Sequence, residues 1–151
     1  MIRAASLAVI LSLACAASAQ SLPAEARAYL GDWTVVDDDT GEAQAVVRLT
    51  EVGGEVEGRI VQVLPTEEHP EPSFTCDDCK GDFTGVDLRE VRLIHGMTWD
   101  GERFSGGRIV DVQNDRSYKL LLTLESPDVL KVRGYLGIKA LGRTQRWPRA
   151  D

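Results

Sequence analysis

The chain has 151 residues, and its 17 lysines and arginines against 24 aspartates and glutamates give a formal net charge of −7 at pH 7. Nucleic acid and anionic lipid repel an acidic domain of this kind, and the sequence has no basic stretch with interleaved aromatic residues. Beyond an apolar run near the amino terminus, no segment approaches membrane-spanning length. These features argue against a nucleic-acid-binding protein and against a protein with a membrane span.

The first 19 residues are typical of a secretory signal peptide. Arg3 precedes an uncharged apolar run over residues 4–16, and small residues follow at 17–19, where signal peptidase reads the chain. We expect cleavage before Gln20, which leaves a periplasmic or secreted protein of one domain, residues 20–151, with a net charge of −8. A buried amino-terminal helix and a lipoprotein signal that ends at Cys15 are the alternatives.

The mature chain is predicted to be almost entirely β-structure. Residues 21–30 predict a short helix, since Pro23 suits a first helical turn and Gly31 can end it. After that, apolar and polar residues alternate in short runs separated by turn residues. The predicted strands cover residues 33–36, 43–50, 56–64, 91–97, 106–112, 118–125, 130–136 and 143–147. About eight hairpin-linked antiparallel strands favour an up-and-down barrel, because closure removes exposed strand edges.

A long irregular segment, Pro65–Val86, contains both cysteines of the mature chain, Cys76 and Cys79. In an exported protein two cysteines are expected to pair, so a structural disulfide is the leading interpretation. A redox-active dithiol is an alternative, although no helix in a βαβ setting is predicted to lower a thiol pKa. Zinc binding is another, for which His69 and His95 would have to complete a four-ligand set.

Other patterns for chemistry are weak. Asp37-Asp38-Asp39 lacks the alternating ligands of a calcium loop and is interpreted as a solvated turn. The sequence contains no Gly-x-Ser-x-Gly elbow, no His-Glu-x-x-His motif and no phosphate-binding loop. We therefore expect a protein that is not an enzyme and that needs neither a cofactor nor a metal.

Several short motifs, in their order and spacing, resemble a bacterial exported family called domain of unknown function 2147. The motifs are Gly31-x-Trp33, Thr40-Gly41, Gly58-x-Ile60, Cys76-Asp77-Asp78-Cys79-Lys80-Gly81, Gly106-Gly107-x-Ile109-x-Asp111 with Tyr118, Leu130 to Gly137, and Gly142-Arg143-Thr144-x-x-Trp147. The chain departs from the family pattern at Asp111-Val112 and Asn114-Asp115, which leaves the shape of that turn open. The resemblance implies an exported, lipocalin-like small barrel and no assigned activity.

The pattern of Gly-x-Trp on the first strand with arginines on the last strands is also similar to the lipocalin superfamily. In that superfamily the tryptophan packs at the closed end of the barrel against an arginine from the last strand. The resemblance implies that Trp33 is the packing residue here and that Arg143 or Arg133 stacks on it and closes the barrel.

An eight-stranded barrel can enclose one small ligand, so the leading hypothesis is a carrier of an apolar or amphipathic molecule. The residues expected to line its cavity are Val47, Ile60, His95, Leu120, Leu122, Val132 and Leu136. The alternative is a protein-binding module, such as an inhibitor or an envelope-stress factor, that presents the Cys76–Cys79 loop to an envelope protein. Large side chains filling the interior would favour the second hypothesis over the first.

Overall fold

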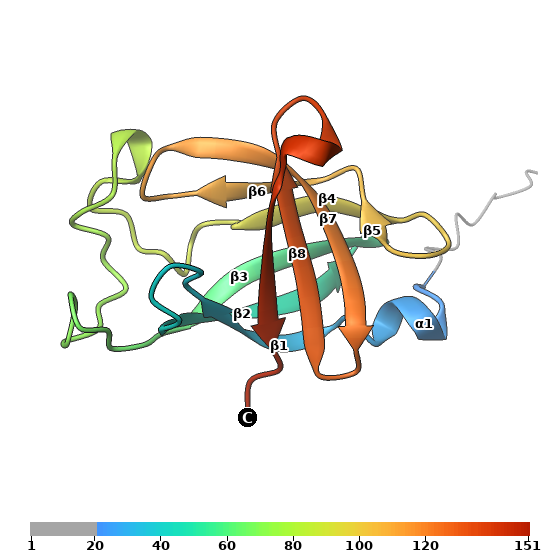
Figure 1. The fold of residues 1–151 in the computed structure, drawn as a ribbon, viewed down its shortest axis with the longest axis horizontal. Coiled ribbons are helices and arrows are strands. Elements are labelled where there is room, and N and C mark those ends of the chain that lie inside the picture. Colours follow the sequence, from blue (N-terminus) through green and yellow to red (C-terminus); the bar gives the residue numbers. More distant parts are fainter. Residues whose placement is uncertain (1–20) are drawn as a thin grey trace, which may run out of the picture.

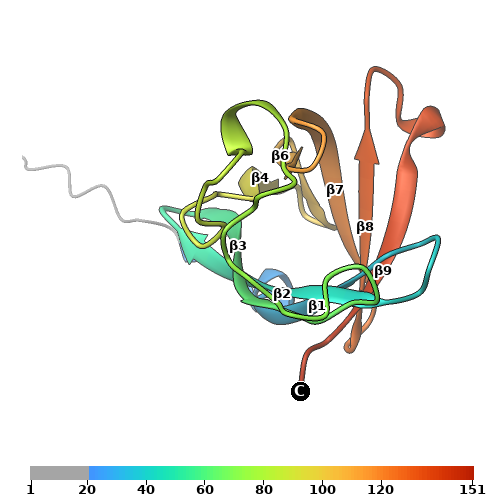
Figure 2. The same cartoon turned by 90° about the vertical axis from the view of Figure 1, so that its left-hand side faces the viewer.

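A computed structural model describes residues 21–151, and the expected signal peptide and Cys15 lie outside them. One antiparallel sheet of nine strands curls around a single core, as the all-β prediction requires (Figures 1 and 2). The elements are α1 (Ala24–Arg27), β1 (Gly31–Val36), β2 (Ala43–Val52), β3 (Glu55–Val63), η1 (Gly81–Phe83), β4 (Ile94–Trp99), β5 (Phe104–Ser105), β6 (Arg108–Asp111), β7 (Arg116–Ser126), β8 (Val129–Tyr135), η2 (Lys139–Leu141) and β9 (Arg143–Pro148).

The strands follow the chain order β1-β2-β3-β4-β5-β7-β8-β9, and β6 also pairs with β4 and β7. The predicted strand 106–112 corresponds to β6, and the ninth strand is β5, a two-residue strand just before it that the sequence did not predict. Gly106 separates them: its φ of +82° is accessible to glycine at little cost, and it breaks the extended backbone. The expected meander is therefore present, with one interrupted position.

The barrel closes unevenly. The last strand meets the first through a single bridge between Trp33 and Arg149, reinforced by the Ala150 N–H, which donates to the Asp32 carbonyl over 3.0 Å. From this point β9 rises away from β1 (Figure 2). At the far end of β9, Arg143 Nε lies 2.7 Å from Asp38 Oδ2 in the β1–β2 turn, so an ion pair spans the seam there.

The helix is shorter than the predicted 21–30 and consists of four residues, with Pro23 as its N-cap. Its function in the fold is to cover one end of the barrel. Ala26 is fully buried, and the Tyr29 ring packs edge-on against Phe104 at 5.1 Å between centroids. Gly31, with φ +112°, then turns the chain into β1.

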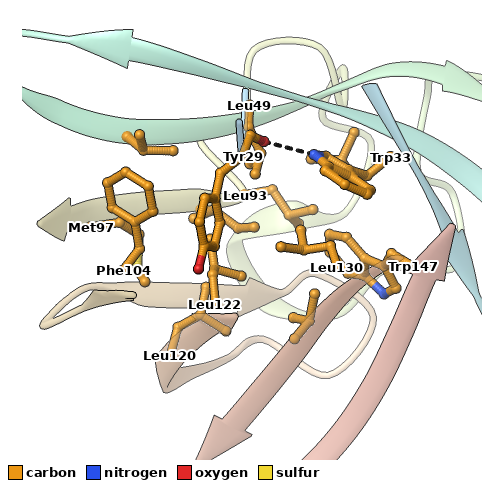
Figure 3. Close-up of a cluster of buried hydrophobic side chains, with 14 of the residues drawn as sticks. Tyr29, Trp33, Leu49, Leu93, Met97, Phe104, Leu120, Leu122, Leu130 and Trp147 are labelled. Carbon is orange, nitrogen blue, oxygen red and sulfur yellow. Dashed lines mark hydrogen bonds between the residues drawn. The ribbon is translucent and has the colours of Figure 1, made fainter. Parts of the chain in front are cut away.

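The core follows the predicted alternation along β2, where Ala45, Val47 and Leu49 are buried. A register shift between Val46 and Val47 marks a bulge opposite β3, and Val46 is buried as well. Figure 3 shows the resulting cluster, in which Tyr29, just after α1, meets side chains from strands around the barrel. In residues 21–151 there is no helix that is long and apolar enough to cross a membrane.

Candidate functional site: the loop along the open end of the barrel

The side chains expected to line a ligand cavity mostly form the packed core instead. Val47, Leu120 and Leu122 are fully buried, and Val132 and Ile60 are nearly so. They share the interior with bulkier groups, which Figure 3 shows converging from several strands: Trp33, Phe104, Met97 and Trp147. Large side chains that fill the centre of a barrel leave little room there for a ligand.

Two of the expected cavity residues lie elsewhere. Leu136 is 57% exposed, because β8 ends at Tyr135 and the chain turns outward through Gly137 at φ +70°. His95 was expected to share an inward face with Met97, but it is only half-buried, whereas its neighbour Ile94 is fully buried. Gly96, at φ +68°, interrupts the extended backbone of β4, so that His95 and Met97 do not share one face. The predictions for Leu136 and His95 as lining residues were therefore wrong.

Trp33 closes the barrel as the resemblance implied, but with a different arginine. The ring is fully buried, and its Nε1–H donates to the Tyr29 carbonyl over 2.8 Å. The guanidinium carbon of Arg149 stands 4.1 Å from the ring centroid. Arg149 Nη1 and Nη2 also donate to the carbonyls of Leu30 and Ala28, at 3.2 and 2.9 Å. Arg149 thus joins the tail after β9 to the segment between α1 and β1.

Arg143 and Arg133 do not stack on Trp33, which corrects the sequence-based assignment. Arg143 is the first residue of β9, at the open end of the barrel, where it pairs with Asp38. Arg133 donates to the Lys139 carbonyl and to Thr144 Oγ1, at 2.7 and 2.6 Å, within the β8–β9 hairpin. The antiparallel bridge between β1 and the tail after β9 places residue 149, not 143, beside Trp33.

Residues 64–93, here called the rim loop, connect β3 to β4 along the open end of the barrel (Figure 2). Their two arms pair as a short ribbon. The Cys76 N–H donates to the Val86 carbonyl at 3.1 Å, and the Leu88 N–H donates to the Phe74 carbonyl at 2.9 Å. Leu88 is buried in the core and Phe74 packs against it. The loop is therefore anchored to the barrel by its middle as well as by its ends.

The tip of this ribbon carries the disulfide between Cys76 and Cys79, whose Cα atoms are 5.3 Å apart. The disulfide prediction is thus confirmed. Cys79 is buried, and its carbonyl accepts a hydrogen bond from Thr84 Oγ1 at 2.7 Å. The cross-link closes the turn at the end of the ribbon, so it orders the tip without joining distant parts of the fold.

A glycine lets the disulfide tip rest on the β6–β7 turn. Gly81 has φ +60°, and a Cβ atom there would lie 1.9 Å from Asp115 Oδ2. Asp115, with φ +52°, adopts the left-handed conformation in that turn. The Asp111 carboxylate caps the turn by accepting from the backbone N–H of Asn114 at 3.1 Å. This is the turn whose sequence departs from the family pattern, and the structure shows that its carboxylates and Asn114 stabilise it.

The rim loop is strongly acidic. Residues 64–93 contain eight aspartates and glutamates and three arginines and lysines. The loop therefore carries −5 of the −8 net charge of residues 21–151. Asp77, Asp78 and Asp82 at the tip are all exposed. His69 Nε2 lies 3.7 Å from Asp78 Oδ2, and both side chains are exposed. The loop therefore presents a negatively charged surface that is ordered from beneath.

We expect the rim loop to loosen in acid. Arg89 lowers the pKa of Asp87 from 3.8 to about 2, first through its side-chain hydrogen bond and then through its backbone N–H. Because this pKa is depressed in the folded protein, the stabilisation is present above about pH 4 and is lost as the pH falls towards 2. Amide exchange of the loop should accelerate in that window, and Asp87→Asn should remove the pH dependence. Equal pH dependence in the variant would contradict the assignment.

Replacing Cys76 and Cys79 by serine should leave the barrel folded. A cross-link across so short a loop stabilises by about 2 kcal/mol at most, and its contacts lie within the loop. Circular dichroism should keep its β signal, while proteolysis should begin to cut between residues 76 and 86. Global unfolding of the double variant at room temperature would show that the disulfide is essential to the fold.

The described chain has two surface hollows away from the disulfide end of the rim loop. The outer faces of β1, β2 and β3 form one of about 440 Å³, which includes the Asp32–Arg48 ion pair and Val61. Ser21, Pro23 and Trp99 border the other, at the helix end of the barrel. None of the seven residues expected to line a cavity borders either hollow.

The metal hypotheses find no supporting cluster in the described chain. Within residues 21–151 no three histidine, cysteine, aspartate or glutamate side chains are grouped so that they could hold a metal ion. At the triple aspartate, Asp37 Oδ1 instead accepts the backbone N–H groups of Asp39 and Thr40 at 2.9 and 2.8 Å. That pattern is an Asx turn, in agreement with the interpretation of this segment as a turn.

Comparison with known proteins agrees with this architecture. The model of a family described as an uncharacterized protein conserved in bacteria, DUF2147, matches residues 31–149. The chain belongs to the DUF2147 family. The match begins at Gly31, which turns the chain into β1, and it includes the closing residue Trp33. Comparison with curated proteins finds no match to this DUF2147 protein.

A solved structure supports the fold. Protein HP1028 from Helicobacter pylori, described as belonging to the lipocalin family, superposes with a TM-score of 0.64 at 13% identity. The alignment covers 81% of this chain and 82% of that protein. At this identity the likeness concerns the fold, and it shows that the DUF2147 barrel is lipocalin-like.

Proposed function

We propose that this DUF2147 protein is a non-enzymatic, exported binding module that acts through the outside of its barrel, with the rim loop as its binding surface. The observation that carries the proposal is the contrast between a filled interior and an anchored, exposed, acidic loop. Trp33, Phe104 and Leu122 occupy the space in which a carrier would hold its ligand. The partner chemistry that suits the loop is a basic protein surface, because opposite charges steer association and favour the matching register.

The anchoring of the loop supports this function. A loop that is already ordered loses little conformational entropy on binding, so more of its contact energy appears as affinity. The Cys76–Cys79 bridge, the ribbon bonds and the burial of Leu88 supply that order. Asp77, Asp78 and Asp82 stay exposed at the end of this ordered loop, where they can contact a partner.

The test compares two triple variants of equal charge change. One neutralises the loop tip, as Asp77→Asn, Asp78→Asn and Asp82→Asn. The control neutralises three exposed acids in or beside turns at the opposite end, as Glu55→Gln, Glu102→Gln and Asp128→Asn. Each protein carries a photo-crosslinking residue at position 73 and is cross-linked in the cells that naturally make it. Native mass spectrometry of the purified protein should then find a cross-linked partner for the parent and for the control. The loop triple should lose it.

Two results would contradict the proposal. Equal recovery of the partner with both triples would mean that the loop charge is irrelevant. A stoichiometric small molecule released from the purified parent protein, with no protein partner, would favour the carrier hypothesis.

Raising the salt concentration should weaken the complex, because exposed charges are screened.

Small-ligand binding is the second candidate, and the lipocalin-like fold favours it. Gly134 offers the matching test, since a Cβ there would make only ordinary contacts, the nearest at 3.5 Å from Tyr118. If a ligand enters from the open end, an apolar fluorescent probe should bind once per chain and Gly134→Leu should abolish binding. The neutralised loop triple should then bind the probe normally. Under the loop hypothesis, the parent protein should bind no probe.

A further inference from the structure

The β8–β9 connection exposes more apolar surface than any comparable segment of the described chain. Residues 136–142, here called the tip, contain Leu136, Ile138 and Leu141, whose exposures are 57%, 61% and 78%. In residues 21–151 the other exposed large aliphatic side chains, Val52 and Val61, stand alone on separate strands. A cluster of three within six positions marks an interaction site, because scattered single residues are the usual pattern.

The tip is held in shape from inside. Arg133 donates through Nε and Nη2 to the Lys139 carbonyl at 3.0 and 2.7 Å, and through Nη2 to the Ala140 carbonyl at 3.3 Å. The Leu141 N–H donates to the Ile138 carbonyl, and the Gly142 N–H donates to the Lys139 carbonyl, both at 3.2 Å. Backbone groups at the crest of the tip are thus bonded within the hairpin.

The tip is also the part of the hairpin that projects farthest. In both ribbon views it rises beyond the sheet, well away from the rim loop (Figures 1 and 2). Its only charged residue is Lys139, which is exposed. The acidic rim loop is therefore a separate part of the surface from residues 136–142.

We propose that the tip docks this protein onto a lipid bilayer by inserting Leu136, Ile138 and Leu141 into the boundary between headgroups and acyl chains. Lys139 would remain at the headgroup level, since a lysine stem can lie along apolar surface while its ammonium stays in water. Three aliphatic side chains give a weak and reversible attachment, comparable in kind to other shallow interfacial anchors.

Two observations favour lipid over a protein partner or a second copy of the chain. Water is scarce at the acyl boundary, so a docking segment must satisfy its own backbone polar groups, and the Arg133 bonds do so for two carbonyls at the crest. The tip is also small and convex. Three side chains are far below the total of about 1,200 Å² that a stable protein interface buries.

The test is binding of the exported, processed protein to vesicles of phosphatidylcholine, which carry no net charge. Within residues 21–151 the core residues lie between 22 and 147, so we expect the chain that begins near Gln20 to fold. The double variant Ile138→Asp, Leu141→Asp should lose at least about tenfold in partition, because an aliphatic side chain contributes about that much when it leaves water. Val52→Asp, an exposed aliphatic residue at the opposite end, should bind like the parent.

A second variant keeps the tip apolar and reports its depth. Leu141→Trp should show a blue-shifted emission with vesicles and quenching by brominated acyl chains, while Val52→Trp should show neither. The proposal is overturned if the double aspartate variant binds as the parent does, or if Val52→Asp loses as much. It is also overturned if the parent protein sediments as a dimer without lipid and the double variant Ile138→Asp, Leu141→Asp sediments as a monomer.

Discussion

Replacement of Trp33 by alanine is expected to lower the free energy of unfolding by about 3–5 kcal/mol. The ring is fully buried and belongs to the core cluster in Figure 3, so its removal leaves a cavity that the surrounding strands cannot fill without moving. The variant also removes the donor to the Tyr29 carbonyl and the surface on which Arg149 stacks. Urea unfolding followed by circular dichroism measures the change, and a loss below 1 kcal/mol would contradict the assignment.

Two arginine variants separate the observed closing contact from the expected one. Arg149→Ala should destabilise by about 1–2 kcal/mol, because a stacked cation and its hydrogen bonds to carbonyls are lost together. Arg143→Ala should cost less than about 1 kcal/mol, since its ion pair with Asp38 is exposed. The opposite order would restore Arg143 as the residue that closes the barrel.

Replacement of Gly107 by alanine is expected to cost about 3 kcal/mol, because overpacking a close backbone contact forces strands apart. A Cβ atom at this position would lie 2.3 Å from the His95 carbonyl oxygen and 2.7 Å from the Gly96 carbonyl carbon. Both are backbone atoms of β4, which cannot rotate out of the way. The strain should appear as a lower urea midpoint and as faster amide exchange in β4 and β6.

Gly134→Ala is the matched control. Gly134 also lies in the sheet and in the family signature, but a Cβ there would be 3.5 Å from its nearest neighbour. Its stability should change by less than about 0.5 kcal/mol, as for an ordinary substitution without strain. If both variants lose the same stability, close approach is not the reason for glycine at position 107.

Local patterns determined the strands and the turns. Alternation of apolar residues located β2, β3, β7 and β8 to within a few positions, because half-buried strands need a side-chain period of two. Cys76 and Cys79 were expected to pair because an exported chain has few other uses for two close cysteines, and the structure joins them. The motifs also predicted the DUF2147 family and the lipocalin-like fold correctly.

The tertiary structure decided what local patterns do not encode. Which arginine reaches Trp33 depends on the register across the seam between β1 and β9, which are far apart in sequence, so Arg149 was missed. Positive φ angles at Gly96 and Gly137 redirected His95 and Leu136 away from the positions that strict alternation assigns. Whether the barrel is open or filled depends on how side chains from all strands meet. That packing is a three-dimensional property, because each strand supplies only part of the core.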